Sequence, residues 1–149
     1  MPVQLKKATS IDIPVLLELE KSVAGINIYS PILEREEWED ELQKCSVYLI
    51  QKNNTTVGSI SYKKQDGGNV YISGLVINPH FQGQGIAHEV LVNLLIELKD
   101  FKRVGLVTHP NNTPALRLYQ SLGFVVEDKK ENYYGDGEPR LVLVLKRTN

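Results

Sequence analysis

Cysteine is nearly absent from this sequence of 149 residues, in which Cys45 is the only one. One cysteine excludes a disulfide within the chain and leaves no cysteine-based metal cluster. The histidines are also few, and their positions lack the spacing of metal ligands (His80, His88 and His109). We therefore expect no metal site.

An excess of charge of one sign is missing too. Lys and Arg number 17 against 18 Asp and Glu, so the formal net charge is −1. This balance argues against a nucleic-acid partner held by counterion release. No apolar segment follows a basic start, and no apolar run approaches the length that spans a membrane. We expect a cytoplasmic enzyme or binding module with no membrane partner.

What the sequence does contain is ordinary for a globular protein. Hydrophobic residues make up 42% and charged residues 23%. The length suits a single domain over residues 1–149 with one real core. There is no internal repeat and no low-complexity linker.

The stretch at residues 74–98 organises the chain. An apolar, β-prone run at 75–77 is stopped by Asn78-Pro79, and Gly83 and Gly85 then allow a tight turn. A stripe at 3.6-residue spacing follows and predicts a helix: Ala87, Val90, Leu91, Leu94, Leu95 and Leu98. A glycine turn that opens a helix directs unpaired N–H groups and the positive end of the helix dipole at one spot. The pattern predicts an anion site.

The other predicted elements follow from periodicity and turn residues. We expect strands at 3–5, 46–51, 56–64, 69–77, 103–108, 124–126 and 141–145, and helices from Thr9 or Ser10 to Gly25, at 33–44, and from a Thr113 cap to Gly123. Strand 103–108 should lie parallel to 69–77, because a helix joins them.

The acidic helix at 33–44 has two interpretations. Trp38 and Leu42 should form its buried side, and its many Asp and Glu residues are typical of a solvated face. The alternative is an acidic rim that attracts a cationic substrate.

Two motifs point to a family. The glycine turn lacks the Gly-Lys-Ser/Thr of a P-loop and the spacing Gly-x-Gly-x-x-Gly, but residues 82–87 fit Gln/Arg-x-x-Gly-x-Gly/Ala. Residues 112–124 fit Asn-x-x-Ala-x-x-x-Tyr-x-x-x-Gly-Phe. In this order the motifs resemble those of the GCN5-related N-acetyltransferases (GNAT), and the resemblance covers the whole chain in element order. It implies an α/β fold (an α+β mixed sheet) of order β-α-α-β-β-β-α-β-α-β-β.

The resemblance also implies a cosubstrate, acetyl-CoA, and residues that hold it. The strands ending near Ile77 and Thr108 would splay apart, and pantetheine would bond to backbone near Val76 and Ile77. Asn112 would bond the arm, and Tyr119 would lie near the thioester sulfur. Backbone N–H groups of the turn would hold the pyrophosphate: Gln82, Gly83, Gln84, Gly85, Ile86 and Ala87. Because the turn has no Arg or Lys, Arg117 or a lysine elsewhere is left to meet the outer phosphates.

The implied reaction is direct attack of an amine on the thioester in a ternary complex. Tyr119 is the candidate acid, because its hydroxyl can donate to a departing thiolate. Backbone N–H near Ile77 can stabilise the oxyanion. Strand 69–77 contains no Asp or Glu, so the candidate base there is Tyr71 acting through a water, with Ser73, Thr108 and His109 as alternatives. We interpret His109 as structural, since it precedes Pro110 at a strand end.

The kind of amine that the site can acetylate depends on how much of that amine is neutral at pH 7. An α-amine is roughly one-seventh neutral at pH 7, whereas a lysine amine is neutral in about one part in 2,500. A site without an obvious carboxylate base suits the α-amine, so we expect a protein or peptide N-terminus, with a small-molecule amine as the alternative. The acceptor groove should include Ile28, Tyr29 and Tyr133.

Other classes stay open. The missing carboxylate base keeps a non-catalytic CoA-binding module as an alternative. A nucleotide-binding α/β domain is disfavoured, because neither phosphate-loop pattern is met. A second copy of the chain, in a homodimer, is a further candidate partner.

Overall fold

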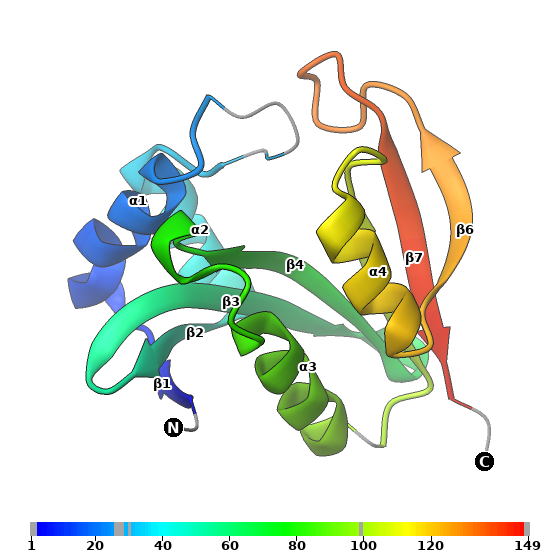
Figure 1. The fold of residues 1–149 in the computed structure, drawn as a ribbon, viewed down its shortest axis with the longest axis horizontal. Coiled ribbons are helices and arrows are strands. Elements are labelled where there is room, and N and C mark those ends of the chain that lie inside the picture. The colour runs from blue at the N-terminus through cyan, green and yellow to red at the C-terminus, as the bar shows by residue number, and fades with distance from the viewer. Residues whose placement is uncertain (1–2, 26–28, 30, 99, 148–149) are drawn as a thin grey trace.

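The computed structural model describes residues 3–25, 29, 31–98 and 100–147. Figure 1 shows a twisted mixed sheet with helices packed on it. The elements are β1 (Gln4–Lys7), η1 (Ser10–Asp12), α1 (Ile13–Lys21), α2 (Arg35–Lys44), β2 (Ser46–Lys52), β3 (Thr55–Gln65), η2 (Asp66–Gly68), β4 (Asn69–Ile77), η3 (Pro79–Phe81), α3 (Ile86–Glu97), β5 (Arg103–Thr108), α4 (Thr113–Ser121), β6 (Val125–Lys130) and β7 (Arg140–Lys146). The predicted α/β class and element order are confirmed.

The seven strands lie in the order β1-β2-β3-β4-β5-β7-β6. All neighbours pair antiparallel except β4 and β5, which pair parallel as predicted. The parallel pair is joined through α3, since a parallel connection must return along the outside of the sheet.

The parallel pair is short. Only residues 69–71 of β4 pair with residues 103–105 of β5. Beyond Tyr71, β4 stays paired with β3 as far as Ile77, and β5 stays paired with β7 as far as Thr108. The two strands therefore separate in the middle of the sheet, which leaves the backbone of each without a partner on the side of the gap.

A bulge in β4 lies where the gap begins. Ser61 of β3 is opposite Gly74, but the next residue, Tyr62, is opposite Ile72, so Ser73 is extra. A bulge reverses the alternation of side chains along a strand. Val70 and Ile72 belong to the same core cluster as Leu75 and Ile77, although two residues separate Ile72 from Leu75, a spacing that would place them on opposite faces of a regular strand.

The helices cover the two faces of the sheet separately. Trp38 of α2 and Ile13 and Leu16 of α1 pack with β2 residues in one cluster. Residues of α3 and α4, including Leu94 and Tyr119, pack with the central strands in a larger cluster. The gap between β4 and β5 therefore connects the face covered by α1 and α2 with the face covered by α3 and α4.

Some predicted boundaries are wrong. The first helix ends at Lys21 rather than at Gly25, and Thr9 caps the short η1 turn that precedes it. Asn112, not Thr113, caps α4: its side-chain oxygen accepts a hydrogen bond from the N–H of Ala115. Asn can replace Thr here because both are good caps.

The described residues form neither a helix that could span a membrane nor a cluster of side chains that could hold a metal ion. None of the helices they form is long and apolar enough to cross a membrane. No group of three or more His, Cys, Asp or Glu side chains in this part of the chain is arranged to hold a metal ion.

Candidate active site

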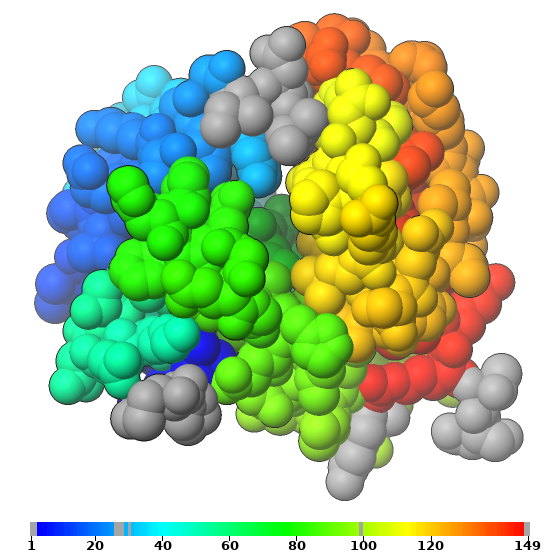
Figure 2. All heavy atoms as spheres, viewed as in Figure 1, coloured from blue at the N-terminus to red at the C-terminus, as the bar shows by residue number. Residues whose placement is uncertain are grey.

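A cavity of about 380 Å³ occupies the gap between β4 and β5. Its walls include residues 72–76 of β4 and residues 106–108 of β5, together with side chains from both faces of the sheet. Asn112 and Tyr119 come from the α4 side, and Trp38 and Glu41 come from α2. Figure 2 shows a hollow between the green segment that precedes α3 and α4, in yellow. The separation of the strands thus creates a passage through the sheet.

The glycine turn leads into α3 as the sequence predicts. Gly83 and Gly85 have φ of +80° and +78°, a region that side chains disfavour, and Gly85 is the residue before the helix. The first helical hydrogen bond runs from the N–H of Glu89 to the carbonyl of Gly85. The N–H groups of Ile86, Ala87 and His88 consequently have no helical acceptor, which is the usual condition of an anion site.

The two glutamines of the turn are already engaged. The Gln82 side-chain Nε2 donates to the carbonyl of Ile77 at 2.9 Å, and its backbone N–H faces the carbonyl of Pro79 at 3.4 Å. Gln82 therefore ties the turn to the end of β4, and its amide is not one of the free donors that we expected. The Gln84 Oε1 accepts a hydrogen bond from Lys52 Nζ at 3.2 Å. This contact brings a cation from the end of β2 to a turn that has none of its own.

Tyr119 is buried in the cavity wall with 8% of its surface exposed. Its ring meets that of Phe124 edge to face, with centroids 5.8 Å apart. Burial raises the pKa of Tyr119 to about 12, and the nearby Tyr29 adds to the rise. The Tyr119 hydroxyl therefore keeps its proton over the working pH range. Tyr29, expected in the acceptor groove, does line the cavity, whereas Ile28 lies outside the described residues.

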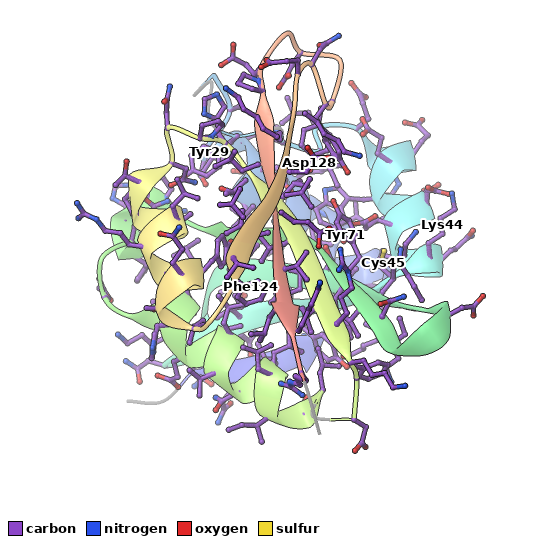
Figure 3. All side chains as sticks on the ribbon, turned by 90° about the vertical axis from the view of Figure 1, so that its right-hand side faces the viewer. Tyr29, Lys44, Cys45, Tyr71, Phe124 and Asp128 are labelled. Atoms are coloured by element: carbon purple, nitrogen blue, oxygen red, sulfur yellow. The ribbon has the colours of Figure 1, made fainter. Side chains whose placement is uncertain are left out.

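Tyr71 approaches from the opposite side. Figure 3 shows Tyr71 on the side of the sheet where Cys45 and α2 lie, whereas Phe124 lies on the side of α4. Burial raises the pKa of Tyr71 well above its usual range, and the hydroxyls of Tyr134 and Tyr133 add to the rise. The proposal of Tyr71 as a base is therefore disfavoured by its surroundings, because a base must lose its proton first.

The C-terminal loop also differs from expectation. Tyr134, not the predicted Tyr133, lines the cavity, while Tyr133 lines a separate hollow on the sheet. Arg140 holds this loop: it is 2% exposed, donates to Asp136 Oδ2 at 3.0 Å, and stacks over the Tyr134 ring at 5.1 Å. A tyrosine pair at this position was visible in the sequence, but which ring turns inward depends on Arg140.

His109 has the structural role that we expected. Its Nδ1 accepts the N–H of Asn111 at 3.0 Å, so Nε2 carries the proton and donates to Glu138 Oε1 at 2.8 Å. With both ring nitrogens occupied and only 2% of its surface exposed, His109 joins the end of β5 to the loop before β7. Thr108 beside it is also buried in the cavity wall.

The cavity contains carboxylates that come from α1 and α2 rather than from β4, where the sequence offered no acidic base. Glu41 Oε2 accepts hydrogen bonds from Ser73 Oγ at 2.9 Å and Ser61 Oγ at 3.2 Å. The two hydroxyl oxygens lie 3.0 Å apart. Because Ser61 is on β3 and Ser73 is on β4, one carboxylate oxygen connects α2 to both strands at the bulge. The two donated hydrogen bonds hold Glu41 in one position.

Glu20 of α1 and Glu37 of α2 line the same cavity. Glu20 is 6% exposed. Burial raises the pKa of its carboxyl to about 7; the backbone N–H of Ile32 opposes the rise, and the negative charges of Glu41 and Glu37 add to it. Carboxylates therefore gather at the α1/α2 end of the passage, so the interpretation of the acidic helix as only a solvated face is wrong for Glu41.

The helical spacing of the sequence indicates that Glu20 and Glu41 lie on the buried faces of their helices. Glu20 is four residues after Leu16, and Glu41 is three residues after Trp38, so each shares a face with a core residue. An acidic residue on the apolar face of a helix indicates a buried charge with a purpose.

Sequence and structure comparisons agree with this geometry. The profile of the acetyltransferase (GNAT) family matches residues 16–124. The chain belongs to this family. A probable spermine N(1)-acetyltransferase from Bacillus subtilis subsp. natto (strain BEST195) is 40% identical over 60 residues, which are 38% of this chain and 40% of that protein. The chain spans 21%, 40% and 54% of the length of three curated relatives that it matches.

Solved GNAT structures share the whole fold. The ribosomal-protein-S18-alanine N-acetyltransferase from Escherichia coli has a TM-score of 0.84 at 19% identity, covering 99% of this chain and 95% of that one. A GNAT family acetyltransferase from Elizabethkingia anophelis with acetyl-CoA bound has a TM-score of 0.73 at 20% identity, covering 97% and 98%. At these identities the likeness establishes the fold, and the acceptor has to be argued from the site.

Proposed function

We propose that this chain transfers the acetyl group of acetyl-CoA to a primary amine by direct attack in a ternary complex. The observation that carries the proposal is the gap between β4 and β5 beyond Tyr71, which opens into a cavity that contains Tyr119 and carboxylates. An extended ligand can enter such a gap and bond to free strand backbone on either side.

The cosubstrate has a site that fits its parts. A diphosphate would accept hydrogen bonds from N–H groups between Gly83 and His88, with the α3 dipole adding up to about 2 kcal/mol. Lys52, which already reaches Gln84, supplies a positive charge beside it. The pantetheine arm would lie along Val76 and reach Asn112, both in the cavity wall. In this arrangement the thioester lies between the two faces of the sheet.

The chemistry then needs a donor and an acceptor of protons. Tyr119 is a permanent hydrogen-bond donor, and a donor aimed at the departing sulfur stabilises the negative charge that develops there. Backbone N–H near Ile77 would bond the oxyanion of the tetrahedral intermediate. No metal ion takes part in these steps as proposed.

The acceptor enters from the side of α1 and α2. Three carboxylates at that end of the cavity, Glu20, Glu37 and Glu41, favour an amine that arrives as a cation. A peptide N-terminus meets this description, in keeping with the alanine substrate named for the Escherichia coli structure. A small polyamine is the second candidate, because several carboxylates can bind several ammonium groups and the Bacillus relative is named for spermine.

The test is thiol release from acetyl-CoA in the presence of each acceptor. Parallel reactions contain a peptide with N-terminal alanine, the same peptide with an acetylated N-terminus, or spermine. We expect release with the free peptide or with spermine, and none above background with the acetylated peptide.

Binding is measured separately as a thermal shift with CoA, ATP and NAD, because a ligand that binds the folded state raises Tm. We expect only CoA to raise it. Stabilisation by CoA without release for any amine would favour a non-catalytic CoA-binding module. Stabilisation by ATP or NAD instead of CoA would favour a nucleotide-binding domain.

A further inference from the structure

Glu20 is a buried carboxyl that faces the reaction cavity with little to balance its charge. It lies in the last turn of α1 with 6% of its surface exposed. None of the ion pairs between described residues includes it. The backbone N–H of Ile32 lowers the pKa of Glu20, but burial and the charges of Glu41 and Glu37 outweigh it. A buried charge without a cation destabilises a fold, so its presence in a reaction cavity calls for a functional reason.

Glu41 is the opposite case. Its Oε2 accepts two serine hydrogen bonds, from Ser73 and Ser61, and these fix the position of the carboxylate. The two carboxyl groups therefore differ in environment although they line one cavity. Such a difference is what allows two carboxyl groups to take different parts in one reaction.

The charged and titratable groups around Glu20 complete the description. Glu37 and Glu41 face it from α2, and burial together with these two charges raises its pKa. The other titratable groups in the cavity wall come from the connection between α1 and α2, from β4, and from the region of β5, α4 and β7: Tyr29, Tyr71, His109, Tyr119, Tyr134 and Arg140. Arg140 is held by Asp136 and His109 by Glu138, so neither is available to neutralise Glu20.

Resting on the proposed function, we propose that Glu20 accepts the proton of the acceptor ammonium while Glu41, held by the two serine hydroxyls, keeps that ammonium in place. One N–H proton passes from the ammonium to the Glu20 carboxylate and later to solvent. The freed lone pair forms the C–N bond, and the C–S bond breaks as the tetrahedral intermediate collapses. A second N–H proton ends on the sulfur as the thiol forms, and the third remains in the amide.

This assignment replaces the missing base of β4 and changes the expected acceptor range. Without a base, an alkyl amine is limited by its neutral fraction of about one part in 2,500, and an α-amine by roughly one-seventh. With Glu20 as the proton acceptor, the more basic alkyl amine can also react. Loss of Glu20 should therefore harm a spermine reaction much more than a peptide reaction.

The test compares Glu20→Gln with Glu18→Gln, an exposed residue of the same helix. We expect Glu20→Gln to lower kcat by about a hundredfold with spermine and by up to roughly tenfold with the alanine peptide, with little change in the KM for acetyl-CoA. The acidic limb of the kcat/KM profile, expected near pH 7, should disappear. Glu18→Gln should retain the wild-type rate and profile.

A conservative variant and a binding measurement separate a chemical role from a structural one. Glu20→Asp keeps a carboxyl and should retain an acidic limb at a reduced rate. Glu41→Gln should raise the KM for the amine more than it lowers kcat. Thermal melting checks that each variant folds, and CoA-induced stabilisation checks that each binds the cosubstrate.

Two results overturn the assignment. If Glu20→Gln has wild-type kcat, or loses rate equally at every pH while keeping the limb, Glu20 is not the proton acceptor. Both results are obtained only if the wild type acetylates an amine, so they contradict the role of Glu20 and not the proposed function. If the wild type turns over neither amine, the proposed function itself fails.

Discussion

Ser73 Oγ donates a 2.9 Å hydrogen bond to Glu41 Oε2, and this bond joins the bulge of β4 to α2. The bulge gives Ser73 a position that regular pairing with β3 would not allow. The same stretch of β4 has no partner on the side of β5. One local irregularity thus coincides with the opening of the sheet and with the placing of a carboxylate in it.

The Ser73–Glu41 bond gives a first prediction. Ser73→Ala removes one of two donors to a carboxylate in the cavity, and we expect a loss of about 1–3 kcal/mol in the free energy of unfolding. The KM for the amine should rise, while the KM for acetyl-CoA should stay near that of the wild type. Urea denaturation and steady-state kinetics measure these values.

A double-mutant cycle with Glu41→Gln checks that the effect passes through this pair. The interaction energy should account for most of the Ser73→Ala loss. Additive losses would mean that the hydroxyl stabilises something other than Glu41.

Tyr119→Phe gives a second prediction. The substitution keeps the ring that packs on Phe124 and removes only the hydroxyl. We expect turnover to fall about a hundredfold, with CoA affinity nearly unchanged, because donation to the sulfur matters only as the bond breaks. Tyr71→Phe is the matched control on the other side of the cavity, and a similar loss there would remove the distinction between the two tyrosines.

The pKa of Glu20 gives a third prediction, about stability. It is about 7 in the folded protein against an ordinary value of 4.5. Below pH 4.5 the group is protonated in both states. Between 4.5 and 7 the folded state binds more protons, so the free energy of unfolding falls as pH rises, by up to about 3 kcal/mol above pH 7. Glu20→Gln should therefore melt at a higher temperature than the wild type at pH 8, and the difference should shrink toward pH 4.5.

Glu18→Gln controls for removing a charge from α1, since Glu18 is exposed. It should show no comparable pH dependence relative to the wild type. A Glu20→Gln protein that is equally or less stable than the wild type at pH 8 would contradict the burial of an unbalanced charge.

Lys52 gives a fourth prediction. Its contact with Gln84 brings it to the turn, and we expect Lys52→Ala to weaken CoA binding about threefold to tenfold, less so at high salt. Lys44→Ala, which removes a cation from α2 next to Asp40, should leave CoA binding unchanged. Isothermal titration at two salt concentrations makes the comparison. Equal effects of the two variants would show only a general influence of net charge.

The parts of this fold that the sequence predicts well are those with local causes. Strand β4 has the predicted bounds, because Gly67-Gly68 and Asn78-Pro79 fix both its ends. The turn at Gly83 and Gly85 is predicted equally well, since a positive φ favours glycine.

The parts that the sequence did not predict depend on tertiary contacts. The role of Glu41 depends on a bulge that brings Ser73 to it, and the shift in alternation between Ile72 and Leu75 does not indicate which side chain Ser73 will contact. Glu20 comes from α1, outside either family motif, and lies in the cavity only because α1 packs beside β3 and β4. Lys52 reaches the turn across 32 residues of sequence, which no local pattern can indicate.

A crystal structure of this protein with CoA tests the central claim most directly. The account predicts the diphosphate against the N–H groups between Gly83 and His88, and the thiol inside the passage between β4 and β5, near the Tyr119 hydroxyl. A CoA molecule bound on another face, with that passage free of ligand, would contradict it.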